Sequence, residues 1–152
     1  MKIKYPKARR IKKYPVVSVD IIIQDSKKRI LLGKVSRKWA GSRRALWGLP
    51  GREVLFGESL KGCVERNLKE ELNLIMISGK IVCVNSNFGY GNHYVSIGVL
   101  VKTKGILVNK RPNDWIEWRW FKKRHIPKKL FPSAERTLKT FHKKLVSLDF
   151  KK

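Results

Sequence analysis

Acidic residues are scarce in this chain of 152 residues, which has 11 Asp and Glu against 36 Lys and Arg and a formal net charge of +25. Cysteine is scarcer still, and the two present, Cys63 and Cys83, exclude a disulfide framework and a cysteine-based metal site. No apolar run approaches the length that crosses a membrane, and the basic start lacks the apolar stretch of a secretory signal. We therefore predict a cytoplasmic protein with reduced thiols and no membrane partner.

The excess of positive charge has two interpretations that the sequence leaves open. Adaptation to heat usually raises Lys and Glu together, so it does not explain a chain with few acids. A strongly basic surface attracts polyanions such as nucleic acids and nucleotides, whereas the alternative is a solvated surface in an organism with a Lys-rich proteome. Since no recognised nucleic-acid-binding motif accompanies the charge, we expect only weak, non-specific nucleic-acid binding. The oligomeric state also stays open, a homodimer included.

The chain divides into a basic arm, residues 1–13, which contains no acid, and a single domain, residues 14–152. Within the domain, apolar residues alternate with polar ones in several short runs, a pattern typical of strands. We expect the first two strands to pair as a hairpin and the next two to be separated by a loop at 87–92. The predicted strands are 15–23, 29–35, 80–86, 93–103 and 115–121.

Two segments have the spacing of amphipathic helices. Between Leu60 and Leu72 the apolar residues fall on one helical face. Ser59 suits the N-cap of this helix, and Asn73 suits the left-handed position just past its end. A second amphipathic helix is predicted over 133–148. Strands, a helix, more strands and a final helix predict an α+β fold, with a mixed β-sheet sandwiched between helices.

The scarce carboxylates gather in one short window, because five of the eleven lie between residues 50 and 74. On a helix over 59–72, Glu70 and Glu71 share a face with position 67, and Glu58 can reach the same region if the preceding loop folds back. Like charges repel unless a cation lies between them, and oxygen ligands without Cys or His suit Mg²⁺ or Mn²⁺. The alternative is an exposed acidic helix face, with pairs such as Arg66 and Glu70.

The segment LPGREVLFGES…ERNLKEELNL resembles the Nudix hydrolase box, G-x5-E-x7-R-E-U-x-E-E-x-G-U, where U is aliphatic. Three positions depart from the box: Arg52 replaces its first Gly, Asn67 replaces the first Glu of the helix, and Asn73 replaces the last Gly. The Asn73 replacement is mild, because Asn tolerates the left-handed conformation. The residues that match in order and spacing are Glu58, Arg66, Leu68, Glu70, Glu71 and Leu74.

The resemblance extends beyond the box, over roughly residues 14 to 121. YPVVSVDIIIQDSKKRILLGK, HYVSIGVLV and WIEWRWF are similar to the GDP-mannose mannosyl hydrolase branch of the Nudix family, which also lacks the first helix Glu. The branch implies a metal bound by the Gly51 carbonyl, Glu71 and Asp114, with Glu70 as a further candidate ligand. It also implies attack on the sugar carbon, which releases a nucleoside diphosphate and a free sugar.

The general base of the branch is a His that falls on Trp115, and Trp cannot accept a proton. Asp114, Glu70 or His93 could take that role, whereas ordinary Nudix attack on phosphorus needs no His. The basic loop 36–45 would suit a nucleotide pocket, because its arginines could bind phosphates and an indole could stack on a base. The alternative is a basic loop that contributes only one Trp to the core. The candidate catalytic residues are Glu58, Arg66, Glu70 and Asp114. The candidate substrate-binding residues are Asp20, Arg37, Arg52, His93 and Tyr94.

The sequence therefore predicts Mg²⁺- or Mn²⁺-dependent hydrolysis of a nucleoside diphosphate-linked substrate, with a GDP-mannose-like nucleotide sugar preferred. One alternative is a nucleoside triphosphate pyrophosphohydrolase on the same fold. Another is a Nudix-derived module that binds nucleic acid, with its catalysis lost through the changes at Arg52, Asn67 and Trp115. Metal-dependent turnover separates both hydrolases from this module.

Overall fold

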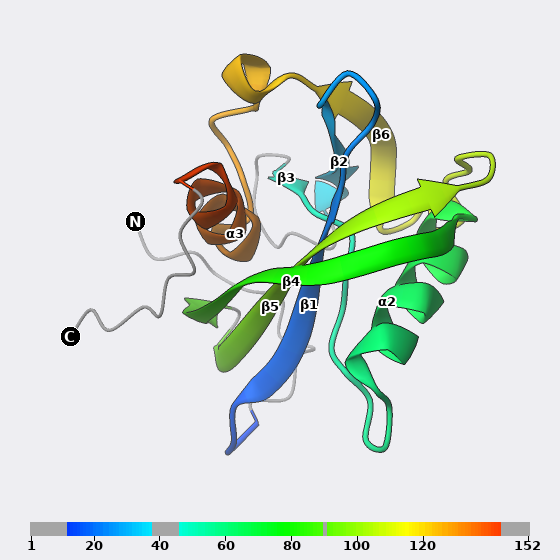
Figure 1. The fold of residues 1–152 in the computed structure, drawn as a ribbon. Helices are drawn as coiled ribbons and strands as arrows, with labels where there is room; N and C mark the ends of the chain where they lie inside the picture. The colour runs from blue at the N-terminus through cyan, green and yellow to red at the C-terminus, as the bar shows by residue number, and fades with distance from the viewer. Residues whose placement is uncertain (1–11, 38–45, 90, 144–152) are drawn as a thin grey trace.

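The computed structural model describes residues 12–37, 46–89 and 91–143. Its strands form two three-stranded sheets, and its two main helices lie on opposite sides of the first of them (Figure 1). Within the described residues, no helix is both long and apolar enough to cross a membrane. The elements in chain order are β1 (Val16–Ile23), β2 (Ile30–Val35), β3 (Trp47–Gly48), α2 (Leu60–Asn67), a π-helical turn (Leu68–Leu72), β4 (Ile75–Gly89), β5 (Asn92–Lys104), β6 (Trp115–Phe121), a 3₁₀ turn (Lys123–His125) and α3 (Pro132–Lys143).

The first sheet is mixed and has the order β1-β5-β4. Strand β1 runs parallel to β5, from the pair Val16–Tyr94 to the pair Ile23–Val101, while β4 and β5 are antiparallel neighbours. The second sheet has the order β3-β2-β6 and is antiparallel throughout. The predicted α+β fold, with a mixed sheet between helices, is confirmed.

The predicted hairpin of the first two strands is wrong. A tight turn at Asp25 does follow β1, and the Asp25 carboxylate accepts hydrogen bonds from the backbone of Lys27 and Arg29. Beyond one bridge between Gln24 and Ile30, however, β1 and β2 separate into different sheets. Both strands are largely buried, so each needs packing on both faces. Strand β1 obtains it in the first sheet, where α2 covers one face and α3 the other.

The core consists of two clusters on opposite faces of β1. Successive side chains of a strand point to opposite faces, so Val19 and Ile21 pack with α2 while Ile22 packs with α3. The same alternation directs Asp20 to the α3 side, where it meets Thr137. A carboxyl group from a largely apolar strand thus lies between the sheet and the helix.

The predicted helix over 59–72 is confirmed at both ends but changes form inside. The Ser59 hydroxyl accepts a 3.0 Å hydrogen bond from the Gly62 amide, as an N-cap does, and Asn73 is left-handed with φ of 59°. Between them, the last turn from Leu68 to Leu72 is π-helical rather than α-helical.

The remaining strands and the last helix are confirmed, with different limits. The predicted loop at 87–92 is shorter than expected, because β4 continues to Gly89 and β5 begins at Asn92. Helix α3 begins at Pro132, where a fixed φ suits the first turn. The part of the predicted helix after residue 143 lies outside the described residues, as do most of the basic arm and residues 38–45 of the basic loop.

Candidate active site

The loop between β3 and α2 is held against the edge of β1 by backbone hydrogen bonds. The amides of Ile21 and Val19 donate to the carbonyls of Pro50 and Arg52, at 2.8 and 3.0 Å. Gly51 lies between these bonds with φ of +139°, and a Cβ at this position would collide with the Val19 carbonyl. Only glycine fits such a close approach of two backbones at positive φ. The nearby backbone of Gly51 also lowers the pKa of the Glu71 carboxyl, against the larger effect of burial.

Glu58 and Arg66 join this loop to helix α2. The Nε and Nη2 atoms of Arg66 donate to the two carboxylate oxygens of Glu58 at 2.7 and 2.9 Å, and Nη2 also donates to the Glu53 carbonyl at 3.1 Å. This bidentate pair lowers the pKa of Glu58 to about 2. Glu58 therefore stays ionised near neutral pH and is poorly suited to accept a proton. The pair acts as a clamp between loop and helix.

Glu70 and Glu71 do not project together, so that prediction is wrong. Successive helical positions are about 100° apart around the axis. The Glu70 side chain is 50% exposed and lies 3.8 Å from Arg66, whereas Glu71 is 1% exposed and turns inward. Asn67 is also buried, and its amide donates to the Cys63 carbonyl at 2.7 Å.

One arginine, Arg52, contacts the carboxylates of both Glu71 and Asp114. The Nε atom of Arg52 lies 2.8 Å from Glu71 Oε1, and its Nη2 atom lies 2.8 Å from Asp114 Oδ2. Arg111 approaches the same Asp114 oxygen at 2.7 Å. Burial raises the pKa of Glu71, although the Arg52 guanidinium opposes this effect. The second oxygen of Glu71, Oε2, is buried and has no hydrogen-bond partner within the described part of the chain.

The predicted metal ligands Gly51, Glu71 and Asp114 do meet, because all three line one small pocket. Their oxygens are of the kind that Mg²⁺ prefers, but the Arg52 guanidinium already spans the two carboxylates. As arranged, these residues do not fit a divalent cation. Glu70 is turned away, and the described residues contain no cluster of three or more Asp, Glu, His or Cys suited to a metal.

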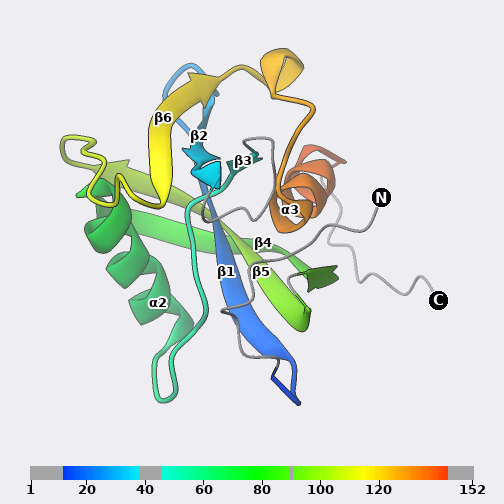
Figure 2. The same cartoon turned by 180° about the vertical axis from the view of Figure 1, so that it is seen from behind.

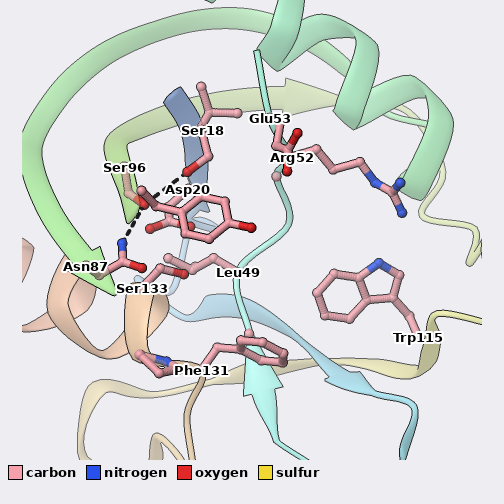
Figure 3. Close-up of a pocket in the computed structure, with 15 residues that line it drawn as sticks. Ser18, Asp20, Leu49, Arg52, Glu53, Asn87, Ser96, Trp115, Phe131 and Ser133 are labelled. Carbon is pink, nitrogen blue, oxygen red and sulfur yellow. Dashed lines mark hydrogen bonds between the residues drawn. The ribbon is translucent and has the colours of Figure 1, made fainter. Parts of the chain in front are cut away.

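A larger pocket adjoins this charged group and shares Gly51, Arg52 and Trp115 with it. Figure 3 shows the Arg52 side chain extending away from Asp20 and past Trp115. The pocket therefore has the Arg52 guanidinium at one end and, at the other, the Asp20 carboxyl among hydroxyl and amide groups. Its polar side chains are Ser18, Asp20, Arg52, Glu53, Asn87, Ser96 and Ser133, and its aromatic ones are Tyr94, Trp115 and Phe131.

Asp20 is a buried carboxyl in this pocket. The Thr137 hydroxyl donates to its Oδ2 atom at 2.8 Å, and Ser133 supplies a further hydrogen bond. Burial nevertheless raises the pKa of Asp20 to about 6. Beside it, Ser96 forms hydrogen bonds with Ser18 at 3.0 Å and with the Asn87 amide at 2.9 Å (Figure 3). This end of the pocket presents ordered hydroxyl and amide groups to a ligand.

A protein-family model of the NUDIX domain matches residues 14–141 of this chain. The chain belongs to the Nudix family. It is accordingly a Nudix hydrolase, a class that hydrolyses nucleoside diphosphate derivatives, generally with Mg²⁺.

Solved Nudix structures share its fold. It is similar to the MutT NUDIX hydrolase from Burkholderia pseudomallei, with 25% identity, a TM-score of 0.74, and coverage of 84% of this chain and 98% of that one. The MutT protein from Methanosarcina mazei Go1 has 24% identity and a TM-score of 0.73, over 87% of this chain and 96% of that one. The NUDIX domain of Shewanella oneidensis NrtR complexed with ADP ribose has 18% identity and a TM-score of 0.68, over 87% and 89%.

The structure brings together only some of the residues that were predicted to bind substrate. Asp20, Arg52 and Tyr94 line the larger pocket. Arg37 is exposed and lies outside the lining of both pockets. His93 faces away from Tyr94 along β5 and stacks on Phe88, with ring centroids 4.6 Å apart, so it also lies outside the lining.

Sequence reasoning missed several polar groups of this Nudix site. Ser18 shares a face of β1 with Asp20, and Ser96 shares a face of β5 with Tyr94. Polar residues at inward positions of apolar strands were the available signal, because a buried hydroxyl requires a partner. Arg111 had no comparable signal, since it lies in an irregular segment before β6.

Proposed function

We propose that this Nudix hydrolase cleaves a GDP-mannose-like nucleotide sugar, in which a nucleoside diphosphate is linked to a sugar. The observation that carries the proposal is that one pocket has the Arg52 guanidinium at one end and polar and aromatic side chains at the other. Such a pocket suits a ligand with a central diphosphate and an uncharged group beside it. The NrtR domain complexed with ADP ribose supports this, because the same fold there holds a nucleoside diphosphate joined to a sugar.

The residues of the pocket have separate roles in this proposal. Arg52 lies at the charged end, where a guanidinium pairs with phosphate oxygens in bidentate fashion. Tyr94 and Phe131 offer ring faces on which a base or sugar can pack. Asp20 and Ser133 provide hydrogen-bonding groups for the hydroxyls or the amino group of the ligand. The clamp of Glu58 and Arg66 fixes the loop that carries Gly51 and Arg52.

A panel of nucleoside diphosphate sugars and nucleoside triphosphates, each with Mg²⁺ and with Mn²⁺, tests the proposal. We expect turnover of a nucleotide sugar to exceed that of every triphosphate. Preferred turnover of a triphosphate supports the alternative pyrophosphohydrolase instead. Absence of turnover with all substrates, together with nucleic-acid binding that survives physiological salt, supports the non-catalytic binding module.

Hydrolysis in ¹⁸O-labelled water then identifies the atom that is attacked. We expect the label in the free sugar, as attack on the sugar carbon requires. Label in the phosphate product means that water attacks phosphorus, and it contradicts the mechanism implied by the mannosyl hydrolase resemblance.

Two variants of the same helical segment connect turnover to the site. Glu71→Gln removes the buried carboxylate that contacts Arg52, and kcat/KM should fall by roughly 100-fold because the guanidinium is no longer held in place for the diphosphate. Glu65→Gln changes an exposed partner of Lys61 and should leave turnover unchanged. Equal losses in the two variants contradict the assignment of the site.

A further inference from the structure

Arg52 occupies a position for which the Nudix box specifies glycine, and its side chain lies between two carboxylates that come from distant parts of the chain. Glu71 belongs to the π-helical turn after α2, and Asp114 directly precedes β6. One guanidinium contacts both, with N–O distances of 2.8 Å to each. The convergence of two carboxylates on one point is the arrangement expected around a bound cation, and in this chain the cation is a side chain.

The burial of Glu71 makes such a cation necessary. A carboxylate that is 1% exposed is costly to bury unless it is paired. Arg52 supplies the pairing for Glu71, and Arg52 and Arg111 together supply it for Asp114. Two negative charges thus face two positive charges, and the group is already balanced. A divalent ion added to this group would meet two guanidinium groups at close range, so its electrostatic attraction to the site is largely cancelled.

Arg52 has room to leave. Its side chain is 28% exposed, in contrast with Glu71, and it lines the larger pocket as well as the smaller one. Rotation of the guanidinium toward the larger pocket would release Oε1 of Glu71 and leave the Asp114 carboxylate paired with Arg111 alone. The unpartnered Oε2 atom of Glu71 offers a further oxygen at the same place.

We propose that Arg52 is a built-in cation that competes with divalent metal for Glu71 and Asp114, so that the free protein binds metal weakly and only when the guanidinium moves away. This inference concerns the protein without substrate and does not rest on the proposed nucleotide-sugar activity.

Titration of Mn²⁺ into the full chain without nucleotide, followed by the electron paramagnetic resonance signal of free Mn²⁺, tests the competition. In Arg52→Gln, which is close to Arg in length but uncharged, we expect Mn²⁺ to bind about tenfold more tightly or better, since at least one charge-assisted bond no longer has to be broken. The double variant Arg52→Gln/Glu71→Gln should lose this gain. Equal affinities of the wild type and Arg52→Gln overturn the proposal.

Arg29→Gln is the matched control. It also removes one positive charge from an ion pair, the 2.7 Å contact with Asp25 in the turn after β1. Its Mn²⁺ affinity should match that of the wild type, and a gain equal to that of Arg52→Gln overturns a local role for Arg52. Should Arg52→Gln fail to fold, the same titration is made on Arg52→Lys, because a Lys ammonium does not reproduce the bidentate geometry of Arg. A tighter affinity than wild type supports the proposal there, and an unchanged one overturns it.

Discussion

Thr137 of helix α3 donates a 2.8 Å hydrogen bond to Asp20 of strand β1, and this contact joins the last helix to the first strand beside the pocket. Asp20 is 7% exposed, and burial raises its pKa from 3.8 to about 6 even though the bonds from Thr137 and Ser133 oppose the increase. The charge of the pocket therefore changes within the weakly acidic range of pH.

Asp20 should make the stability of the protein depend on pH. Because its pKa is higher in the folded state, the protonated carboxyl favours folding fully below pH 3.8, and this contribution is lost as the pH rises through about 6. Asp20→Asn stays neutral throughout. Relative to this variant, the wild type should lose roughly 3 kcal/mol of unfolding free energy over that range. Urea denaturation at a series of pH values measures the difference, and parallel profiles for the two proteins contradict the prediction.

The clamp of Glu58 and Arg66 should show the opposite dependence. The pKa of Glu58 is lowered from 4.5 to about 2 in the folded state, so its stabilising effect is present above pH 4.5 and is lost as the pH falls toward 2. We expect Glu58→Gln to cost about 1–3 kcal/mol of unfolding free energy at neutral pH, because it loses a hydrogen-bonded charge. The cost should shrink as the pH is lowered. Glu65→Gln, on the exposed side of the same helix, serves as the control.

Gly33 should be irreplaceable, unlike the glycine with which it pairs. A Cβ on Gly33 would collide with the Trp115 ring and would lie 2.8 Å from the Trp118 ring. Gly33→Ala should therefore destabilise the fold by about 3 kcal/mol. Gly48 is its direct partner in the antiparallel ladder, and a Cβ there would make ordinary contacts at 3.5 Å. If chemical denaturation shows Gly48→Ala to be as destabilising as Gly33→Ala, crowding by Trp115 is not the cause.

Basic residues gather beside the β1–β2 turn. We expect binding to non-specific RNA or DNA at low salt that is largely lost near physiological ionic strength. Replacing the three basic residues of this group that follow β6 with Gln should lower the slope of log affinity against log salt by up to about 0.9 per lost phosphate contact. The group lines one shallow depression and consists of Lys27, Lys28, Lys122, Lys123 and Arg124.

The control for that experiment is a second triple variant, which also loses three positive charges but on another part of the surface. Lys61, Lys69 and Lys80 are exposed, and they lie on α2, the π-helical turn and β4. Replacing these three with Gln should change the slope less. If both triple variants change it equally, net charge alone accounts for the binding, and the surface beside the turn has no special part in it.

Features that depend on residues close together in the sequence were predicted correctly from sequence patterns. The N-cap at Ser59 and the left-handed Asn73 were both predicted, because capping depends on a few neighbouring residues. The strand Trp115–Phe121 was predicted with the limits that the structure shows. The box spacing likewise located Glu58 near the helix, where it meets Arg66.

Long-range partners could not be predicted from the same patterns. Strand β2 follows β1 after a short turn, the order expected of a hairpin, yet it pairs with β6, which is far away in the sequence. The inward turn of Glu71 and the outward turn of Glu70 depend on which face of the helical segment packs against the sheet. Arg52 reaches across 19 residues to Glu71 and 62 to Asp114, and no spacing rule for a single helix or strand covers such a contact.

The loop that carries Gly51 and Arg52 has a consequence for the association of whole molecules. It runs alongside β1 (Figure 2) and continues to bond with it as far as the 2.9 Å contact from the Val54 amide to the Val17 carbonyl. An uncovered strand edge can pair with the edge of another chain and so start aggregation. Because the loop covers the edge of β1 that β5 leaves open, residues of the candidate site also protect the protein from edge-to-edge assembly. Variants that loosen this loop should therefore become less soluble as well as less active.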